Sequence, residues 1–267
     1  MTDRRPELGV EQEGPVLRLR LQRPERRNAM TREMLAQLVE QIEGAPESEG
    51  VRVIVLNGEG EHFCSGMDLM AVNAESEKKP RVGDIQRRLP RGANRLIQAM
   101  LHAQIPIVCA VRGWASGLGC HLALASDFVI ASRRARFSEP FVARGFTPDS
   151  GATYLLARVV GLVRARRMLL LGEEVSGEQA ADWGLVHEVV EDEALEAATE
   201  EITRRLAESA TFALGLTKWL MHRSLDLDLA DALSNEALAL ELSARSRDFK
   251  EGLAAFAKKR PPRYEGR

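Results

Sequence analysis

The sequence predicts an α/β fold with a helical C-terminal region. Through about the first two-thirds of the 267 residues, short apolar segments with the pattern of strands alternate with amphipathic segments that have the pattern of helices. Residues 191–256 are rich in Ala, Leu and Glu and carry helical signal almost alone. Hydrophobic residues make up 45% of the chain and charged residues 28%, a balance that allows a globular protein with a sizeable core.

The first third of the chain contains two predicted strands and a helix. Residues 16–24 (VLRLRLQRP) alternate apolar and polar side chains, which is the period of a half-buried strand, and residues 51–58 form a second strand. Between them, residues 31–45 have the spacing of an amphipathic helix, with Thr31 as its predicted N-cap. Residues 73–84 (NAESEKKPRVGD) are polar and are expected to form a surface loop.

The middle of the chain continues this alternation. A helix is expected over residues 85–102, followed by a buried strand at 105–111 (IPIVCAV). A glycine-rich joint, residues 112–119, leads into a short helix that ends near Ser126. Another strand is expected at 127–132 (DFVIAS), so strands and helices still alternate at this point of the chain.

Two later helices carry starting signals. After a short extended piece (ARFSEPF), Thr147 is the predicted N-cap of the helix in TPDSGATYLLARVVG, with Pro148 at the first helical position and Asp149 in the first turn. Ser176, with Gln179 three residues later, forms a capping-box pattern. Each signal predicts a helix that starts directly after a loop.

Charge and composition exclude several classes of protein. The formal net charge is −2, so no basic field favours nucleic acid and no polybasic segment favours anionic lipid. No apolar run resembles a secretory signal or reaches the ~18–20 residues of a membrane span. The three cysteines have no paired spacing, which argues against disulfides and against a structural zinc site. A cytoplasmic protein without a bound metal is therefore expected.

The glycine-rich joint places Gly113, Gly117 and Gly119 between a strand and a helix. A dinucleotide fingerprint would need a small residue where Leu122 stands and an acid about 20 residues further on, and a Walker motif would need a Lys. These residues are missing. Glycines at a helix start let backbone N–H groups converge, which suits a developing oxyanion. The alternative is a tight turn in which the glycines serve geometry alone.

A second segment has the same context. Residues 62–69 (HFCSGMDL) also follow a strong strand and contain a glycine, Gly66. One N–H group from each segment would give a shared carbonyl oxygen two donors, which is the usual number in an oxyanion hole. The two segments form a candidate oxyanion site, with two unrelated tight turns as the alternative.

Six segments, in order, resemble signatures of the crotonase superfamily, also called the enoyl-CoA hydratase/isomerase family: RPERRNAM, HFCSGMDL, AVRGWASGLGCHLALASDFVIAS, RGFTPDSGATYLLARVVG, GEEVSGEQAADWGLVHEVV and RSRDFKEGLAAFAKKRPPRY. The fourth is most similar to the epoxyphenylacetyl-CoA isomerase branch. The resemblance implies a spiral of β-β-α turns over residues 1–200, a helical trimerisation region at 201–267, and a homotrimer or a dimer of trimers. It also implies an acyl-CoA thioester substrate, with no cofactor beyond the CoA of that substrate.

The same resemblance assigns the oxyanion site. It implies that the backbone N–H groups of Met67 and Leu118 hold the thioester oxygen, and that Gly117 and Gly119 clear space for the Leu118 N–H. Many hydratases of the family have Gly at the position of Leu118, so a larger side chain here requires a compatible backbone. The other residues of the first segment expected at the substrate are Ser65, Gly66, Asp68 and Leu69, of which Asp68 is expected to order the loop.

The acids of this chain depart from the hydratase pattern. Hydratases of the family use two glutamates, and their positions hold His121 and Phe141 here. Glu139 lies two residues from the second position, a displacement of ~6–7 Å in an extended segment, so it is not expected to take that role unaided. Asp149 matches the single carboxylate of isomerases in the superfamily; the alternative is an Asp that only complements a helix dipole.

His121 also has two interpretations. It is either a proton shuttle beside the oxyanion site, because its reference pKa lies near neutrality, or a hydrogen-bonded core residue. The resemblance implies further contacts with CoA: Arg26 and Arg27 for the phosphates, the backbone of Ala29 for adenine, and Lys259 for the nucleotide of a neighbouring subunit. For these basic residues the alternative is a solvated surface. The side chains expected to line the acyl pocket are Trp114 and Phe141.

The leading hypothesis is an acyl-CoA isomerase that acts through Asp149 and the oxyanion site. The alternatives are a hydratase in which His121 and Asp149 replace the glutamates, a thioester hydrolase, and an acyl-CoA-binding protein with little chemistry of its own. A Rossmann oxidoreductase is excluded by the missing fingerprint. Acyl chain length and branching do not follow from the sequence.

Overall fold

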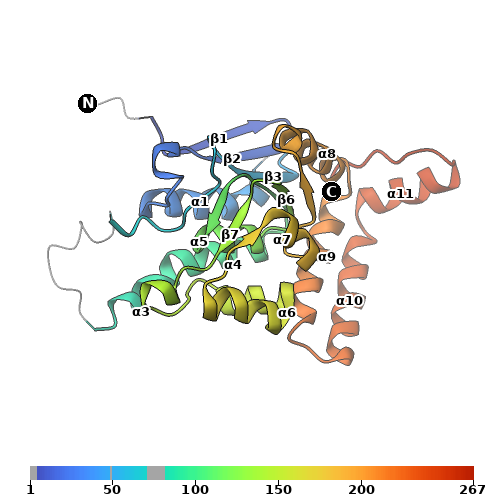
Figure 1. Cartoon of the computed structure of the whole chain (residues 1–267). Coiled ribbons are helices and arrows are strands. Elements are labelled where there is room, and N and C mark those ends of the chain that lie inside the picture. The colour runs from blue at the N-terminus through green and yellow to red at the C-terminus, as the bar shows by residue number, and fades with distance from the viewer. Residues whose placement is uncertain (1–4, 49, 71–81) are drawn as a thin grey trace.

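Two β-sheets organise the chain, and the computed structural model describes residues 5–48, 50–70 and 82–267 (Figure 1). In the larger sheet the strand order is β1-β2-β3-β4-β6-β9; β1 is antiparallel to β2, and the other neighbours are parallel. Its strands are β1 (Leu8–Glu13), β2 (Val16–Leu21), β3 (Val53–Gly58), β4 (Ile107–Val111), β6 (Phe128–Ser132) and β9 (Glu188–Val190). Because β3 and β4 are parallel neighbours, the loops that follow them leave the same edge of the sheet.

The smaller sheet has the order β5-β7-β8. Its strands are β5 (Trp114–Ser116), β7 (Arg136–Ser138) and β8 (Val175–Ser176). Strand β5 follows β4 and leads to helix α5 (Leu118–Leu124), while β7 follows β6 and leads toward helix α6 (Ala152–Leu171). A strand of each sheet and then a helix therefore recur, which confirms the predicted α/β spiral of β-β-α turns.

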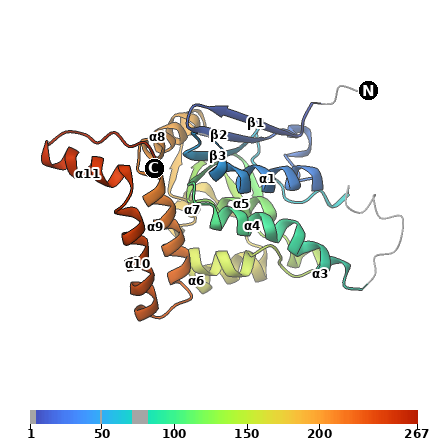
Figure 2. The same ribbon diagram turned by 180° about the vertical axis from the view of Figure 1, so that it is seen from behind.

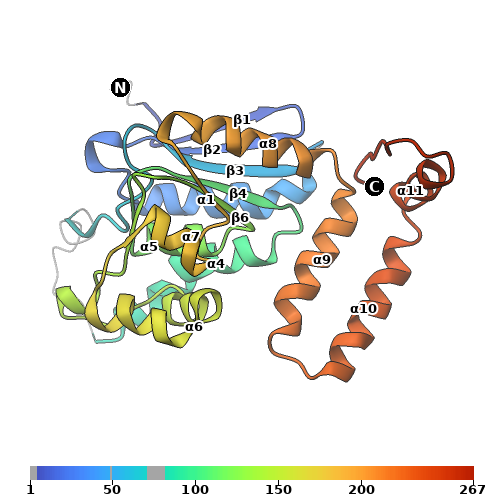
Figure 3. The same ribbon diagram turned by 45° about the vertical axis from the view of Figure 1, so that its right-hand side comes forward.

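Helices cover both faces of the larger sheet (Figure 3). Strand β3 shows why, because its residues Val53, Ile54, Val55 and Leu56 are all buried, so neither face is left to solvent. Ile54 and Leu56 belong to the main core cluster, which is shared with α1 and α4, whereas Val53 and Val55 pack in a second cluster with Leu206 of α8. The helices of these layers are α1 (Arg32–Gly44), α4 (Ala93–His102), α7 (Gly177–Trp183) and α8 (Leu195–Ala207).

Two predicted helix caps are confirmed. The Thr31 hydroxyl accepts a hydrogen bond from the Met34 N–H at 3.2 Å and caps α1. The Ser176 hydroxyl likewise accepts from the Gln179 N–H at 3.2 Å and caps α7. In both helices a side-chain oxygen satisfies one of the backbone donors that a helix start leaves without a partner.

Two helix predictions were wrong in detail. The helix expected at 85–102 is divided into α3 (Asp84–Arg88), a 3₁₀ turn and α4, because Pro90 and Gly92 interrupt it. The helix expected to start after Thr147 begins only at Ala152. Ser150 and Gly151 have φ of +48° and +85°, so the chain makes a left-handed turn before α6 and Asp149 lies in that turn rather than in the helix.

Some strands gave little signal in the sequence. Strand β1 (LGVEQE) lies at the edge of the larger sheet and leaves most of its side chains exposed, so it lacks an apolar pattern. Strands β5, β8 and β9 have three residues or fewer, which is too short for a periodicity. The surface loop predicted at 73–84 lies largely outside the described residues.

The helical C-terminal region is confirmed and stands beside the sheet (Figures 1 and 2). It consists of α9 (Thr211–Ser224), α10 (Leu229–Ser243) and α11 (Arg247–Ala257). The boundary expected at residue 200 falls inside α8, which packs on the sheet. Many large apolar side chains of this region are exposed in the single chain, namely Trp219, Met221, Leu225, Leu229, Leu233, Leu238, Leu240, Leu242, Phe249, Leu253 and Phe256.

After α11 the chain turns back along that helix as a C-terminal strap (residues 258–267). The buried Asp248 carboxylate accepts the backbone N–H groups of Glu265 and Gly266 at 2.7 and 2.8 Å. The Arg52 guanidinium, at the start of β3, donates to the Tyr264 carbonyl at 3.0 Å, to the Thr211 hydroxyl at 2.9 Å and to a carbonyl just before α9. The strap thus joins α11 to α9 and to the larger sheet.

A buried ion pair joins α9 to the core. The Lys218 ammonium donates to the Asp127 carboxylate at 2.7 Å and to the Met100 carbonyl in the last turn of α4 at 2.8 Å. The same Asp127 oxygen accepts the Ile107 N–H at 2.8 Å. Burial lowers the pKa of Lys218, and the Asp127 charge opposes that shift. Within the described ranges, the helices are too short or too polar to cross a membrane.

Candidate functional site

The first loop (residues 62–69) leaves the end of β3 and pairs with the segment that follows β2. The Gly66 carbonyl accepts the Met30 N–H at 2.8 Å, and the Met30 carbonyl accepts the Asp68 N–H at 3.0 Å, so Met67 forms a parallel β-bridge with Met30. Arg27 and Asn28 have φ of +51° and +54°, and this tight turn aligns the segment with the first loop. The backbone at Met67 is therefore held on one side by a second stretch of chain.

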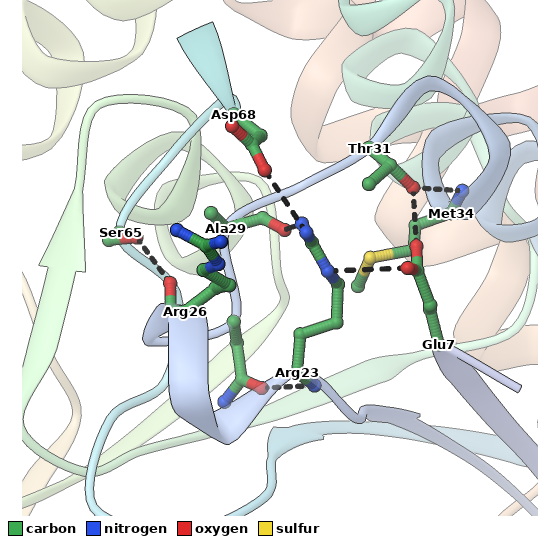
Figure 4. A network of polar contacts seen from close by, with 9 residues as sticks. Glu7, Arg23, Arg26, Ala29, Thr31, Met34, Ser65 and Asp68 are labelled. Atoms are coloured by element: carbon green, nitrogen blue, oxygen red, sulfur yellow. Dashed lines mark hydrogen bonds and ion pairs between the residues drawn. The ribbon is translucent and has the colours of Figure 1, made fainter. Parts of the chain in front are cut away.

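Two side chains that the sequence did not single out, those of Asn28 and Arg23, fix this pairing; Figure 4 shows the contacts of Arg23. Asn28 is fully buried, and its amide donates to the carbonyls of Glu59 at 2.9 Å and His62 at 2.7 Å. The Arg23 guanidinium donates to the Ala29 carbonyl at 2.6 Å and to the Asp68 carboxylate at 3.1 Å. Both residues lie in the segment RPERRNAM, so the family resemblance marked the segment but did not indicate what these two side chains do.

Arg23 also reaches the N-terminal strand, because its Nε lies 3.4 Å from Glu7, which in turn accepts a hydrogen bond from the Thr31 hydroxyl at 3.0 Å (Figure 4). One largely buried guanidinium therefore connects β1, the turn before α1 and the first loop. The expectation that Asp68 orders its loop agrees with this ion pair.

The second loop (residues 112–119) contains β5 and lies directly against the first. The Cys64 N–H donates to the Trp114 carbonyl, and the Cys64 carbonyl accepts the Ser116 N–H, both at 2.9 Å. Gly117 has φ of +52° and ψ of −120°, a conformation that few residues other than glycine adopt, and its N–H donates to the Ser138 carbonyl at 2.9 Å. The two loops form one backbone-bonded unit.

Glycines allow the loops to touch. A Cβ atom at Gly119 would lie 2.3 Å from the Cys64 carbonyl oxygen, and a Cβ at Gly66 would lie 2.9 Å from the Ser116 carbonyl oxygen and 3.7 Å from the Leu118 nitrogen. The space beside Gly119 is thus filled by the first loop and is not open to a ligand, which corrects the role expected for that glycine. Gly66 shows that the first loop, one residue before Met67, adjoins the Leu118 N–H.

The backbone N–H groups of Met67 and Leu118 lie on the two adjoining loops. In the described parts of the chain, neither donates a hydrogen bond, since the bridge with Met30 uses the N–H of Asp68 and Leu118 is the first residue of α5. Backbone N–H groups of this kind are donors from which an oxyanion hole can be built.

We expect Gly119→Ala to damage this arrangement. The added methyl would overlap the Cys64 carbonyl, so the two loops would move apart. Overpacking costs about 1–3 kcal/mol of unfolding free energy, and a displacement of about 1 Å at the site lowers activity about 100-fold. Thermal unfolding and steady-state kinetics measure both effects. Gly44→Ala, whose Cβ meets no atom within 4 Å, is the control, and equal behaviour of the two variants would contradict the prediction.

A buried acid–base pair lies behind the second loop. His121 Nε2 and the Glu139 carboxylate are 3.0 Å apart, and both side chains are 0% exposed. The other polar atoms of the pair, His121 Nδ1 and Glu139 Oε1, are buried and have no hydrogen-bond partner among the described residues. Phe141 stacks on the imidazole with a centroid separation of 5.8 Å and an interplanar angle of 8°. The contact of Glu139 with His121 was not foreseen, because Glu139 lies two residues from the expected position.

Asp149 lies in the left-handed turn before α6 and is half-buried. Its carbonyl accepts the Ala152 N–H at 3.0 Å, and one carboxylate oxygen accepts the Ser150 hydroxyl at 2.9 Å. Gly151 packs next to Ile97 of α4, which anchors the turn to the core. The carboxylate is oriented by its neighbour and belongs to the segment that starts at Phe141.

The remaining predicted residues are distributed as follows. Arg26 and Arg27 are exposed, Ala29 and Ser65 are half-buried, and the Ser65 hydroxyl donates to the Arg26 carbonyl at 3.3 Å (Figure 4). Leu69 is exposed, and Trp114 is half-buried at the first residue of β5. Lys259 is exposed and follows α11, in the strap, so within one chain the structure does not join it to the loops.

The cysteines near the site are buried and not disulfide-bonded. Burial raises the pKa of Cys64 to about 12, and burial together with the neighbouring Glu139 raises that of Cys120 well above its usual range. These thiols are therefore packing groups rather than nucleophiles. Among the described residues no three His, Cys, Asp or Glu side chains gather as metal ligands would.

We also expect Arg23→Met to weaken the first loop. It would remove the charged hydrogen bonds to the Ala29 carbonyl and to the largely buried Asp68 carboxylate, which lowers the unfolding free energy by about 2–3 kcal/mol. Turnover would also fall, about 10- to 100-fold, because Met67 belongs to the first loop and would be displaced with it. Arg23→Lys would retain only part of the stability and turnover, since an ammonium cannot make the same forked contacts as a guanidinium. Arg20→Met on the exposed side of β2 is the control, and an unchanged Arg23→Met enzyme would refute the role.

The fold and the two touching loops define a class: a spiral α/β protein whose candidate site is made largely of backbone. A sequence model of the family described as enoyl-CoA hydratase/isomerase matches residues 11–267. The chain belongs to this family, the crotonase superfamily of enzymes, and the predicted membership is confirmed.

Relatives and solved structures agree. The chain is 38% identical over 252 residues to the 1,2-epoxyphenylacetyl-CoA isomerase of Escherichia coli (strain K12), covering 94% of this chain and 95% of that protein. It is 34% identical to the 2,3-dehydroadipyl-CoA hydratase of the same organism, covering 98% and 99% of the two chains. The crystal structure of a putative enoyl-CoA hydratase from Streptomyces coelicolor A3(2) superposes with a TM-score of 0.92 at 35% identity, covering 100% of this chain and 97% of that one.

Proposed function

We propose that this protein is an enoyl-CoA isomerase that moves a double bond within an acyl-CoA thioester. The observation that carries the proposal is the contact between the two loops, which places the unused N–H groups of Met67 and Leu118 on adjoining segments. In this proposal they form the oxyanion hole for the thioester oxygen. The relatives named above act, by their names, on acyl-CoA compounds, which supports this class of substrate.

The reaction needs one base. Asp149 takes a proton from C2 of a 3-enoyl-CoA, and the electrons move to the thioester oxygen as a dienolate held by the two N–H groups. The same proton then returns at C4, so that the double bond lies between C2 and C3 and no atom is gained or lost. Asp149 is the residue that supports isomerisation over hydration, because the two positions at which hydratases of the family carry glutamates hold His121 and Phe141. No metal or further cofactor takes part in this proposal.

CoA would lie along the first loop and the turn before it. Arg26 and Arg27 are exposed there and available to phosphates, Ala29 offers its backbone to adenine, and Ser65, Gly66, Asp68 and Leu69 border the pantetheine path. Trp114 and Phe141 would line the acyl side. The glycine at position 117 keeps this path free of a side chain beside Phe141.

We further propose a homotrimer or a dimer of trimers in the cytoplasm. The exposed apolar side chains of α9, α10 and α11 form more apolar surface than a monomer usually leaves in water, and this supports residues 201–267 as the assembly region. Assembly would also bring Lys259 of one subunit to the nucleotide of its neighbour. Light scattering coupled to size-exclusion chromatography tests the stoichiometry, and a monomer would refute the assembly.

Product analysis tests the function. Purified protein is incubated separately with a 3-enoyl-CoA and a 2-enoyl-CoA of the same chain length, without added cofactor, and the esters are separated by chromatography. Conversion of the 3-enoyl to the 2-enoyl ester without a 3-hydroxyacyl-CoA supports the isomerase. A 3-hydroxyacyl-CoA from wild-type protein would refute it in favour of a hydratase, and binding of both esters without turnover would favour an acyl-CoA-binding protein.

The hydratase is the second candidate, and one observation favours it. In the His121–Glu139 pair a carboxyl group contacts an imidazole close to the second loop, and hydration requires a group of this kind that can accept a proton from water. Its complete burial behind Phe141 places it second.

A further inference from the structure

We propose that Phe141 determines the reaction specificity of this site by excluding water from the His121–Glu139 pair. This inference rests on the proposed function, because it assumes that a thioester oxygen binds at Met67 and Leu118. Phe141 takes no part in the reaction itself. Its ring separates an acid–base pair from the place where the acyl group would lie.

The position of the ring carries the first step. His121 lies three residues after Leu118 on α5, so the side chains of these two residues lie on the same face of the helix. Phe141 lies parallel to the His121 ring at 5.8 Å, and its Cζ is 3.9 Å from the point where a Cβ of Gly117 would stand. The phenyl ring thus spans from the imidazole to the second loop. Phe146 supports it from the outside in an edge-on contact at 5.4 Å.

The His121–Glu139 pair has two buried polar atoms whose hydrogen bonds are not satisfied among the described residues. His121 Nδ1 and Glu139 Oε1 are buried without partners, although groups of this kind are nearly always hydrogen-bonded in folded proteins. A space lined by a donor or acceptor from each of two such groups binds water once it is large enough for one molecule. Phe141 is 6% exposed and its ring stacks on the His121 imidazole, so in this proposal the ring covers the pair and keeps water from it.

Removal of the ring would therefore add a reaction. In Phe141→Ala, water would enter beside Glu139 and face C3 of a bound 2-enoyl-CoA. Its oxygen would bond to C3 as one of its protons passes to Glu139, and the π electrons of the C2–C3 bond would move to the thioester oxygen. C2 would then take that proton from Glu139 as the thioester carbonyl forms again. The sum is the addition of one water molecule, with no other reactant.

The experiment compares wild-type protein with Phe141→Ala, Phe141→Val and Phe141→Ala/Glu139→Gln in ¹⁸O-labelled water. The substrate is 2-enoyl-CoA, and mass spectrometry measures labelled 3-hydroxyacyl-CoA. We expect at least a tenfold rise in labelled product over wild type in Phe141→Ala and a smaller rise in Phe141→Val. The Glu139→Gln change should remove most of this gain and bring labelled product back toward the wild-type level if the carboxylate is the base. Phe146→Ala, which removes the supporting ring but leaves Phe141 on His121, should add little.

Folding and function are controlled separately. Phe141→Val keeps part of the apolar packing, so it reports on the inference if Phe141→Ala does not fold. Each variant is also assayed for conversion of 3-enoyl-CoA to 2-enoyl-CoA. Isomerisation by wild type and by a folded Phe141 variant, with no labelled product from that variant, would overturn the inference alone. A wild-type protein that does not isomerise would overturn the proposed function and this inference with it.

Discussion

Asp149→Asn is expected to lower isomerase turnover about 100- to 10,000-fold, the range usual for loss of a general base. The amide keeps the size of the carboxylate and can still accept the Ser150 hydroxyl through its oxygen, so the left-handed turn before α6 should persist. What it cannot do is hold a proton between C2 and C4 of the substrate. The measurement is kcat with a 3-enoyl-CoA, together with calorimetric binding of the 2-enoyl-CoA product.

Binding separates this prediction from a structural effect. The residues proposed as oxyanion donors and CoA contacts are outside the turn that carries Asp149, so product affinity should change less than about threefold, or about 0.6 kcal/mol. Asp182→Asn, an exposed residue of α7, is the matched control and should leave both quantities unchanged. If Asp149→Asn turns over as fast as wild type, the carboxylate only serves the turn, and the proposed mechanism fails.

Lys218→Met is expected to give the largest loss of stability among single substitutions outside the site, about 3–5 kcal/mol of unfolding free energy. The change removes the ammonium that contacts both Asp127 and the end of α4, so a largely buried carboxylate would lose its countercharge. Chemical denaturation measures the loss. Lys250→Met on exposed α11 is the control and should stay within about 0.5 kcal/mol of wild type.

A double-variant cycle tests the cause. Asp127→Asn removes the charge but keeps an oxygen that can accept the Ile107 N–H. The double variant Lys218→Met/Asp127→Asn should therefore be more stable than the sum of the single losses predicts, because no unpaired charge remains. Additive losses would show that Lys218 contributes by packing rather than by its charge.

The sequence was most informative where one local pattern decides the structure. Thr31 and Ser176 were predicted as caps because a hydroxyl directly before a helix can accept a backbone N–H of the first turn. Strand β3 was predicted because a strand buried on both faces is a continuous apolar run in the sequence. The glycines that follow two predicted strands indicated the two loops, and the family resemblance assigned Met67 and Leu118 within them. Their contact through Gly66 and Gly119 depends on the parallel neighbours β3 and β4, which no local pattern specifies.

Long-range side-chain contacts were the main omission. The Arg23–Asp68 ion pair joins residues 45 positions apart, and nothing in the string RPERRNAM indicates its partner. Glu139 was set aside by its spacing along an extended strand, yet the chain after β7 turns so that its carboxylate meets His121. The start of α6 was misplaced because Thr147 and Pro148 are a good local signal that Ser150 and Gly151 override with a left-handed turn.

The contacts of Arg52 have a consequence for the order of folding. This residue opens β3, yet its guanidinium is satisfied by Ser209, Thr211 and Tyr264, and the last of these is 212 positions further along the chain. During synthesis from the N-terminus, the Arg52 guanidinium would stay in water until α9 and the strap have left the ribosome. Contacts this distant in sequence are slow to form because a long loop must close first. The contacts that tie the strap to the start of β3 would thus form after most of the chain is made, and the strap amides of Glu265 and Gly266 should become protected from hydrogen exchange only in the final phase of refolding.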